Sequence, residues 1–118
     1  MDWTVEYYRD LKGKEPAADF IDSLPMETQA KLLRTIELLV RYGVLLKEPY
    51  SRRIKGKIRE LRVTDRLGHI RILYFTYTER RFVILHGFVK KSGKTPGREI
   101  EIAEKRMSDF IRRCGGGQ

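Results

Sequence analysis

Three apolar runs separated by short gaps constrain the fold of this chain more than any other feature. They cover residues 58–63, 69–77 and 81–89, and the gaps between them are residues 64–68 and 78–80. Gaps of this length join neighbouring antiparallel strands, whereas a parallel crossover needs a dozen residues or more. The sequence therefore predicts an antiparallel meander in the second half of the chain.

One strand and two helices are expected before the meander. Residues 3–8 alternate and are rich in aromatic and β-branched side chains, which is typical of a strand. A short helix is expected over residues 16–23. A longer helix is expected over residues 25–43, because its apolar residues recur at three- and four-residue spacings between an opening proline and a closing glycine.

Residues 44–54 are expected to be a connection, since Pro49 is incompatible with a regular helix. A last helix, with one apolar stripe, is expected over residues 96–113. The predicted order is β-α-α-β-β-β-α, an α+β fold in a single domain over residues 1–114. The glycine-rich residues 115–118 are expected to be a flexible tail.

Positive charge is concentrated in the meander. Residues 52–98 carry fourteen of the 25 Lys and Arg but three of the 16 acids (Glu60, Asp65 and Glu79), a local net charge of +11. The rest of the chain has a net charge of −2, so the +9 of the whole chain lies in one block. Charge gathered on folded strands attracts a polyanion, and we expect a nucleic-acid surface.

Several classes of site are excluded by composition. No apolar run approaches the roughly 20 residues of a membrane helix, and the N-terminus has no apolar signal core, so we expect a cytoplasmic protein without membrane contact. Cys114 is the single cysteine, so neither an intramolecular disulfide nor a cysteine-based zinc site is possible. The basic block also lacks the convergent carboxylates of a two-metal nuclease. We expect no metal and no cofactor.

Metal-free phosphoryl chemistry remains, and it favours RNA over DNA. RNA supplies its own nucleophile, the 2′-hydroxyl, so the protein need only move protons and stabilise charge on phosphorus. Strand alternation places Arg62 and Arg71 on one face of the sheet, which we expect to be its open face. Either they form a platform for phosphate, or each pairs with a nearby acid such as Glu60.

Three segments resemble a known family. They read IKGKIRELRV at residues 54–63, RILYF at residues 71–75 and LHGFVKKSGKTP at residues 85–96. Together they resemble the RelE/HigB superfamily of type II toxin–antitoxin toxins, in its phage-derived HigB-like branch. The last segment is the most specific of the three.

The resemblance implies a RelE-like fold, with a twisted, mainly antiparallel sheet and helices on one face. It implies an endoribonuclease, or mRNA interferase, that cleaves mRNA in the ribosomal A site by 2′-hydroxyl attack and so inhibits translation. It also implies a cognate antitoxin, a HigA-like helix-turn-helix protein that blocks the basic face.

Residue roles follow from the same resemblance. Arg62 corresponds to the arginine that contacts the scissile phosphate, Lys57 or His86 is the candidate base, and Lys90 is an acid or a second charge stabiliser. A lysine base near neutral pH needs neighbouring cations to lower its pKa from about 10.4. A lone strand histidine such as His86 is more often structural than catalytic. The candidate RNA-binding residues are Arg53, Lys55, Arg71, Tyr74, Lys91 and Lys94.

One feature of RelE is missing. RelE has a tyrosine near its C-terminus that stacks on the substrate base, and residues 96–113 here contain no tyrosine. Three alternatives remain open: Tyr74 or Tyr77 substitutes for this tyrosine, His86 or Phe88 stacks on the base instead, or catalysis is weaker. The alternative function is therefore a non-catalytic RNA- or DNA-binding regulatory module with the same fold.

Overall fold

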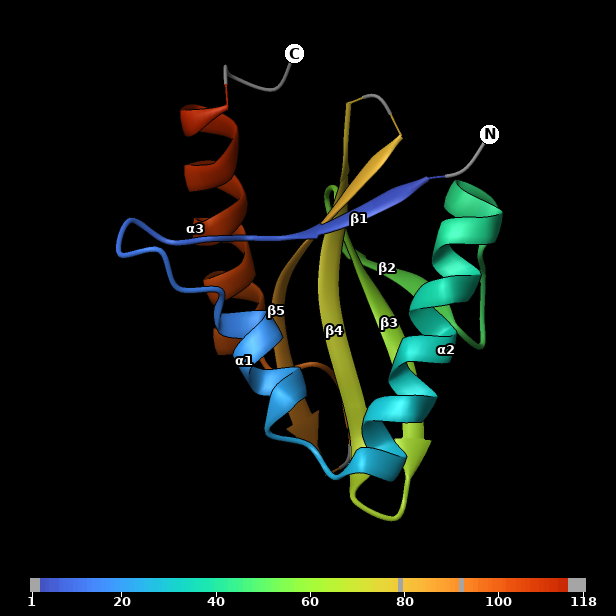
Figure 1. The fold of residues 1–118 in the computed structure, drawn as a ribbon. Helices are drawn as coiled ribbons and strands as arrows, with labels where there is room; N and C mark the ends of the chain where they lie inside the picture. The colour runs from blue at the N-terminus through green and yellow to red at the C-terminus, as the bar shows by residue number, and fades with distance from the viewer. Residues whose placement is uncertain (1–2, 79, 92, 115–118) are drawn as a thin grey trace.

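The computed structural model describes residues 3–78, 80–91 and 93–114. The expected tail over residues 115–118, and Glu79 and Ser92 in two of the expected loops, lie outside the described residues. The elements in chain order are β1 (Thr4–Tyr7), α1 (Pro16–Asp22), α2 (Met26–Tyr42), a 3-10 turn (Gly43–Leu45), β2 (Ser51–Lys55), β3 (Ile58–Asp65), β4 (Gly68–Tyr77), β5 (Arg81–Lys90) and α3 (Gly97–Arg113), as Figure 1 shows.

The strands form one five-stranded sheet in the order β1-β5-β4-β3-β2. β2 to β5 pair antiparallel in chain order, and β1 pairs parallel with β5 at the other edge. The predicted α+β class and the mainly antiparallel meander are confirmed.

The expectation that residues 44–54 form only a connection was wrong for its last residues, because β2 begins at Ser51. β2 pairs with β3 through Ser51 opposite Leu61 and Arg52 opposite Glu60. Its side chains are mostly polar or basic, so it shows no apolar alternation. Backbone pairing at the edge of the sheet, which the side-chain pattern does not reveal, determines this strand.

Gly43 ends α2 and leaves space for the Trp3 side chain. It adopts a φ of +59°, and a Cβ at this position would lie 2.1 Å from the Trp3 indole nitrogen. Trp3 can therefore pack against the end of α2, and its ring stacks on Phe82 of β5 with centroids 4.6 Å apart. Across the residues that the structure describes, no helix combines the length and the apolar character that a bilayer span requires.

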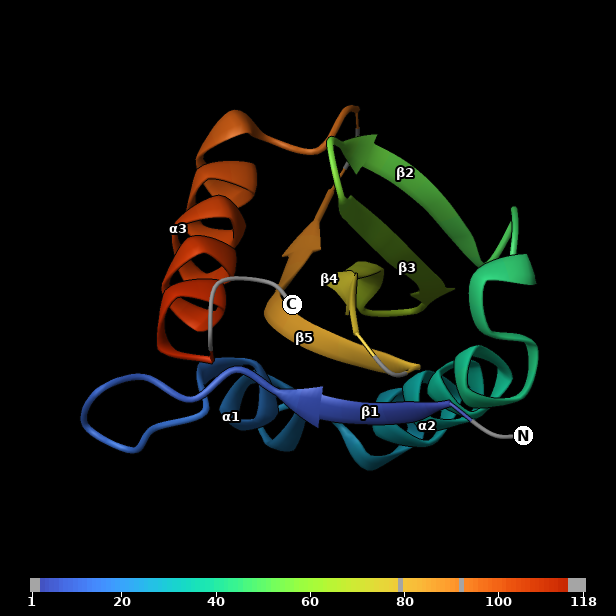
Figure 2. The same ribbon diagram turned by 90° about the horizontal axis from the view of Figure 1, so that it is seen from above.

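Helices cover both faces of the sheet, so the expectation of helices on one face is corrected. In Figure 1, α3 lies to the left of the sheet and α2 to its right, and Figure 2 shows the same separation from above. One core joins α1 and α2 to the even-numbered residues of β4, such as Ile70 and Ile72. A second core joins α3 to Leu73, Phe75 and Tyr77 of the same strand. β4 is apolar on both faces, and each face needs a cover.

Candidate nucleic-acid interface

A group of charged side chains lies on the α3 face of the sheet. The register places Arg52 of β2 opposite Glu60 of β3, and Arg62 of β3 opposite Arg71 of β4. Since residues two apart share a face of a strand, these four side chains point to one side. The Glu60 cluster, as we name it, consists of Arg52, Glu60, Arg62, Arg71, Lys90 and Thr95.

Glu60 lies at the centre of this cluster, and its side chain is 2% exposed. Its Oε1 atom is 3.5 Å from Nε of Arg71 and 3.7 Å from Nε of Arg62. Its Oε2 atom accepts a hydrogen bond of 2.5 Å from the Thr95 hydroxyl. All three segments that carried the family resemblance therefore meet at one buried carboxylate. Of the two alternatives for the arginines, pairing with Glu60 is what the structure shows.

The two arginines differ in exposure. The Arg71 side chain is 3% exposed, and its Nη1 atom donates to the carbonyl oxygen of Ile70 at 3.1 Å. Burial lowers the pKa of Arg71; the Glu60 carboxylate opposes this, and the positive charges of Arg62 and Arg52 add to it. The expectation that Arg71 lies on an open face is therefore corrected. Arg62, with a side chain 26% exposed, is the member of the pair that reaches the surface.

The Nε atoms of Arg62 and Arg71 are buried and have no hydrogen-bond partner among the described residues. Their distances to Glu60 are those of ion pairs and exceed hydrogen-bonding range. Four cations surround one acid in the cluster, so it keeps a net positive charge. An anion is the group that this arrangement is suited to bind.

Lys90, at the end of β5, contributes the fourth positive charge of the cluster. Its Nζ atom donates to the carbonyl oxygen of Gly93 at 2.5 Å. Burial lowers the pKa of Lys90; Arg71, Arg62 and Arg52 lower it further, and Glu60 opposes them. A lysine in such surroundings gives up its proton more readily than an ordinary one. Lys91 and Lys94 are exposed on the loop that follows.

The predicted basic residues before β3 lie at the rim. Lys57 is exposed in the turn between β2 and β3, and Arg53 is exposed on β2. Lys57 precedes Glu60 by three residues, which is about 10 Å along a strand. Lys55 is also exposed, and its Nζ atom lies 3.1 Å from a carboxylate oxygen of Glu104 in α3. Among the described residues, none of these three side chains forms a hydrogen bond or an ion pair with Glu60.

His86 lies outside the cluster and joins β5 to α3. Its Nε2 atom is 2.5 Å from a carboxylate oxygen of Glu99, and Nη1 of Arg106 is 3.2 Å from its Nδ1 atom. Arg106 can only donate, so Nδ1 accepts and the proton resides on Nε2. Burial lowers the pKa of His86; the Glu99 hydrogen bond opposes this, and the charge of Arg106 adds to it. Both ring nitrogens are thus occupied by helix residues.

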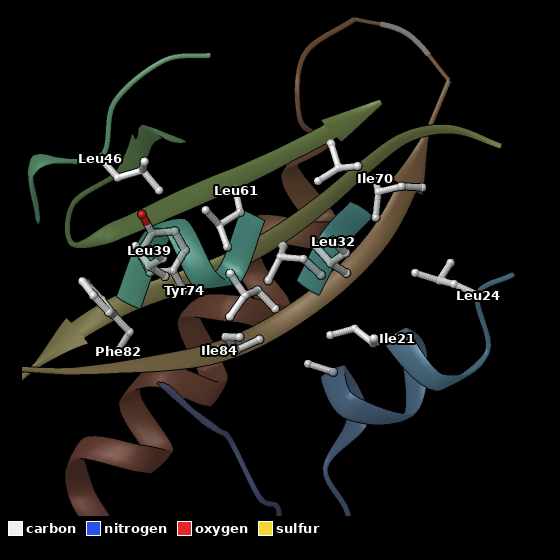
Figure 3. Close-up of a cluster of buried hydrophobic side chains, with 14 residues drawn as sticks. Ile21, Leu24, Leu32, Leu39, Leu46, Leu61, Ile70, Tyr74, Phe82 and Ile84 are labelled. Carbon is white, nitrogen blue, oxygen red and sulfur yellow. The ribbon is translucent and has the colours of Figure 1, made fainter. Parts of the chain in front are cut away.

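Tyr74 also lies apart from the cluster. It is 1% exposed within the core on the α1 and α2 side, where its ring packs against Phe82 with centroids 5.6 Å apart (Figure 3). Its hydroxyl is 2.6 Å from the Ser51 hydroxyl. The structure therefore places this predicted RNA-binding residue in the core.

Three members of the cluster were missed by sequence reasoning as site residues. Arg52 was missed because β2 was not predicted, and its pairing with Glu60 depends on that strand. Glu60 was considered only as a partner for single arginines, and Thr95 was not assigned to the site. The signal that could have found Glu60 and Thr95 is their presence in two of the three family segments.

The comparisons with known proteins cover the whole cluster. Residues 19–108 match the family described as Phage derived protein Gp49-like (DUF891). The chain is also similar to the protein named Probable endoribonuclease HigB1 in two strains of Mycobacterium tuberculosis. This chain and the relative are 32% identical over 114 residues, which cover 95% of this chain and 88% of the relative. The chain therefore belongs to the Gp49-like family, the phage-derived HigB-like branch of the toxins of toxin–antitoxin systems.

Proposed function

We propose that this chain is an endoribonuclease toxin that cleaves mRNA in the ribosomal A site. The observation that carries the proposal is the Glu60 cluster, with four cations around one buried acid and two buried guanidinium nitrogens without hydrogen bonds. Family membership and the endoribonuclease name of the relative support it. The cognate antitoxin, in this proposal a HigA-like helix-turn-helix protein, neutralises the toxin.

The proposed reaction needs no metal. The 2′-oxygen of the substrate attacks the adjacent phosphorus, and the bond from phosphorus to the 5′-oxygen breaks. One proton leaves the 2′-hydroxyl and another reaches the 5′-oxygen. The products are a 2′,3′-cyclic phosphate and a 5′-hydroxyl, so the protein must stabilise charge on phosphorus and move protons.

Arg62 is the proposed charge stabiliser, because its guanidinium group is at the surface of the cluster and always charged. Lys90 is the proposed proton-transfer group, because burial and three neighbouring arginines lower its pKa. Lys57 at the rim is a second candidate for the base. His86 is a weaker candidate than the sequence indicated, since both of its nitrogens contact α3 residues.

A non-catalytic RNA-binding module is the second candidate. The observation that favours it is the burial of the residues expected to replace the missing tyrosine. Tyr74, Tyr77 and Phe88 are 1%, 8% and 7% exposed, and none of them presents a ring to a substrate base.

Induction of the chain alone in a bacterial host, with primer extension on abundant transcripts, tests the proposal. We expect cuts inside translated codons, and we expect them to disappear with Arg62→Ala. Arg66→Ala is the matched control, because Arg66 is exposed and pairs with Glu27 at 2.8 Å, outside the cluster. A soluble, folded wild-type chain that produces no cuts would refute the nuclease and favour the binding module.

A further inference from the structure

A groove of about 910 Å³ lies between α2 and the second half of β3, on the face of the sheet opposite to the Glu60 cluster. Its walls carry the basic residues Lys31, Arg34 and Arg41 of α2; Arg62 of β3 also lines the groove, although its guanidinium group points to Glu60 on the other face. Among the described residues, Glu37 is the one acid that lines it. Arg34 and Arg41 are exposed and form no salt bridge with the described residues. The groove is therefore positively charged.

Tyr50 lines the same groove with its aromatic side chain. It is 43% exposed, and its ring stacks on no other ring among the described residues. Its carbonyl oxygen accepts a 2.9 Å hydrogen bond from the Arg62 backbone N–H, so the two residues are held side by side. An exposed aromatic ring thus lies in the wall of the basic groove.

We propose that this groove binds a single-stranded stretch of the RNA substrate, with Tyr50 as the platform on which one base stacks. The inference rests on the proposed RNA cleavage and adds a subsite to it. Proteins that bind single strands combine a basic groove along the backbone with aromatic rings under the bases. Arg34 and Arg41 contact the phosphates, and Lys31 to Arg41 spans about 15 Å of helix, enough for a few nucleotides.

RNA fits the groove better than an acidic peptide does. The basic side chains serve either ligand, but an exposed, unstacked ring among them serves a nucleobase.

Binding of a fluorescent, 2′-O-methylated hexanucleotide tests the subsite without cleavage, because the methyl group blocks the nucleophile. We expect Tyr50→Ala to weaken binding by about 5- to 150-fold, the range of base–aromatic stacking. Tyr50→Phe keeps the ring and should bind within about twofold of wild type. Tyr42→Ala is the matched control, since Tyr42 is 48% exposed and does not line the groove.

The charge of the groove is tested in the same assay. Arg34→Glu should weaken binding, whereas Lys105→Glu, the same change of charge on α3, should leave it within about twofold. Wild-type binding with no effect of Tyr50→Ala and Arg34→Glu would overturn the subsite and leave the proposed cleavage standing. If Tyr50→Ala loses binding but the wild-type chain never cleaves RNA, the subsite would be supported and the proposed cleavage would be refuted. A groove that binds a Glu-rich peptide but not the hexanucleotide would show that it is a peptide site.

Discussion

Replacement of Glu60 by glutamine tests the central role of this carboxylate in the fold. The change keeps the shape of the side chain and its acceptor for Thr95 but removes the negative charge. The side chains of Glu60 and Arg71 are 2% and 3% exposed, so solvent does not screen their interaction. Glutamine leaves Arg71 as a buried cation without a counter-charge. Removal of one partner of a buried ion pair costs about 3–5 kcal/mol.

The expected loss is large relative to the stability of a small domain, which is about 5–15 kcal/mol. For 118 residues, the unfolding entropy at the midpoint is about 0.25 kcal/mol/K, so Tm should fall by about 12–20 °C. Urea unfolding followed by circular dichroism measures the free-energy change directly. The double variant Glu60→Gln/Arg71→Met should recover most of the loss, because it also removes the stranded cation.

Glu27→Gln is the control for this experiment. Glu27 is only 2.8 Å from Arg66, closer than Glu60 is to either arginine, but the two side chains are 65% and 90% exposed. Exposed pairs contribute about 0–1 kcal/mol, so this variant should unfold almost as wild type does. Equal effects of Glu27→Gln and Glu60→Gln, or a Glu60→Gln loss below about 1 kcal/mol, would refute the reasoning.

Three further predictions concern other parts of the chain. His86 has a folded-state pKa below its unfolded value, so its contribution to the free energy of unfolding should be fully present above about pH 6.5 and should decrease as pH falls below it. Urea unfolding at pH 7.5 and 5.5 measures this decrease, and His86→Gln should remove the part that His86 causes. Gly87→Ala should cost about 1–3 kcal/mol by urea unfolding, because the new Cβ would lie 2.4 Å from the Phe20 ring; a neutral result would mean that α1 shifts freely. RNA affinity should fall with salt at a log–log slope of about −0.7 per phosphate, and Arg62→Ala should reduce the slope by about one such unit, while an unchanged slope would place Arg62 away from phosphate.

The order of the helices and of the meander strands could be predicted because side-chain periodicity determines them. β2 could not, since an edge strand of basic residues has no apolar alternation. The second core was missed for a related reason. Arg71 was assigned to an open face, and Leu73, Phe75 and Tyr77 share that face of β4. A strand that is apolar on both faces predicts a cover on each.

The site was predicted in part. Arg62 and Lys90 were identified as site residues, and the structure brings them together near Glu60. The structure also shows that Arg71 and Tyr74 are buried and that His86 contacts α3. These features depend on packing between segments that are distant in the sequence, and the residue pattern of a single strand does not reveal such packing. Tyr50 lies in a stretch without periodicity, and only the groove beside it indicates a role.

The most direct test of the proposed chemistry is cleavage of a defined mRNA on purified ribosomes in the presence of a metal chelator. One substrate is all RNA, and the other carries a single 2′-deoxy nucleotide 5′ to the cut. We predict cleavage of the first with a 2′,3′-cyclic phosphate end, no cleavage of the second, and loss of activity with Arg62→Ala. Cleavage of the 2′-deoxy substrate, or activity that chelation abolishes, would contradict the account.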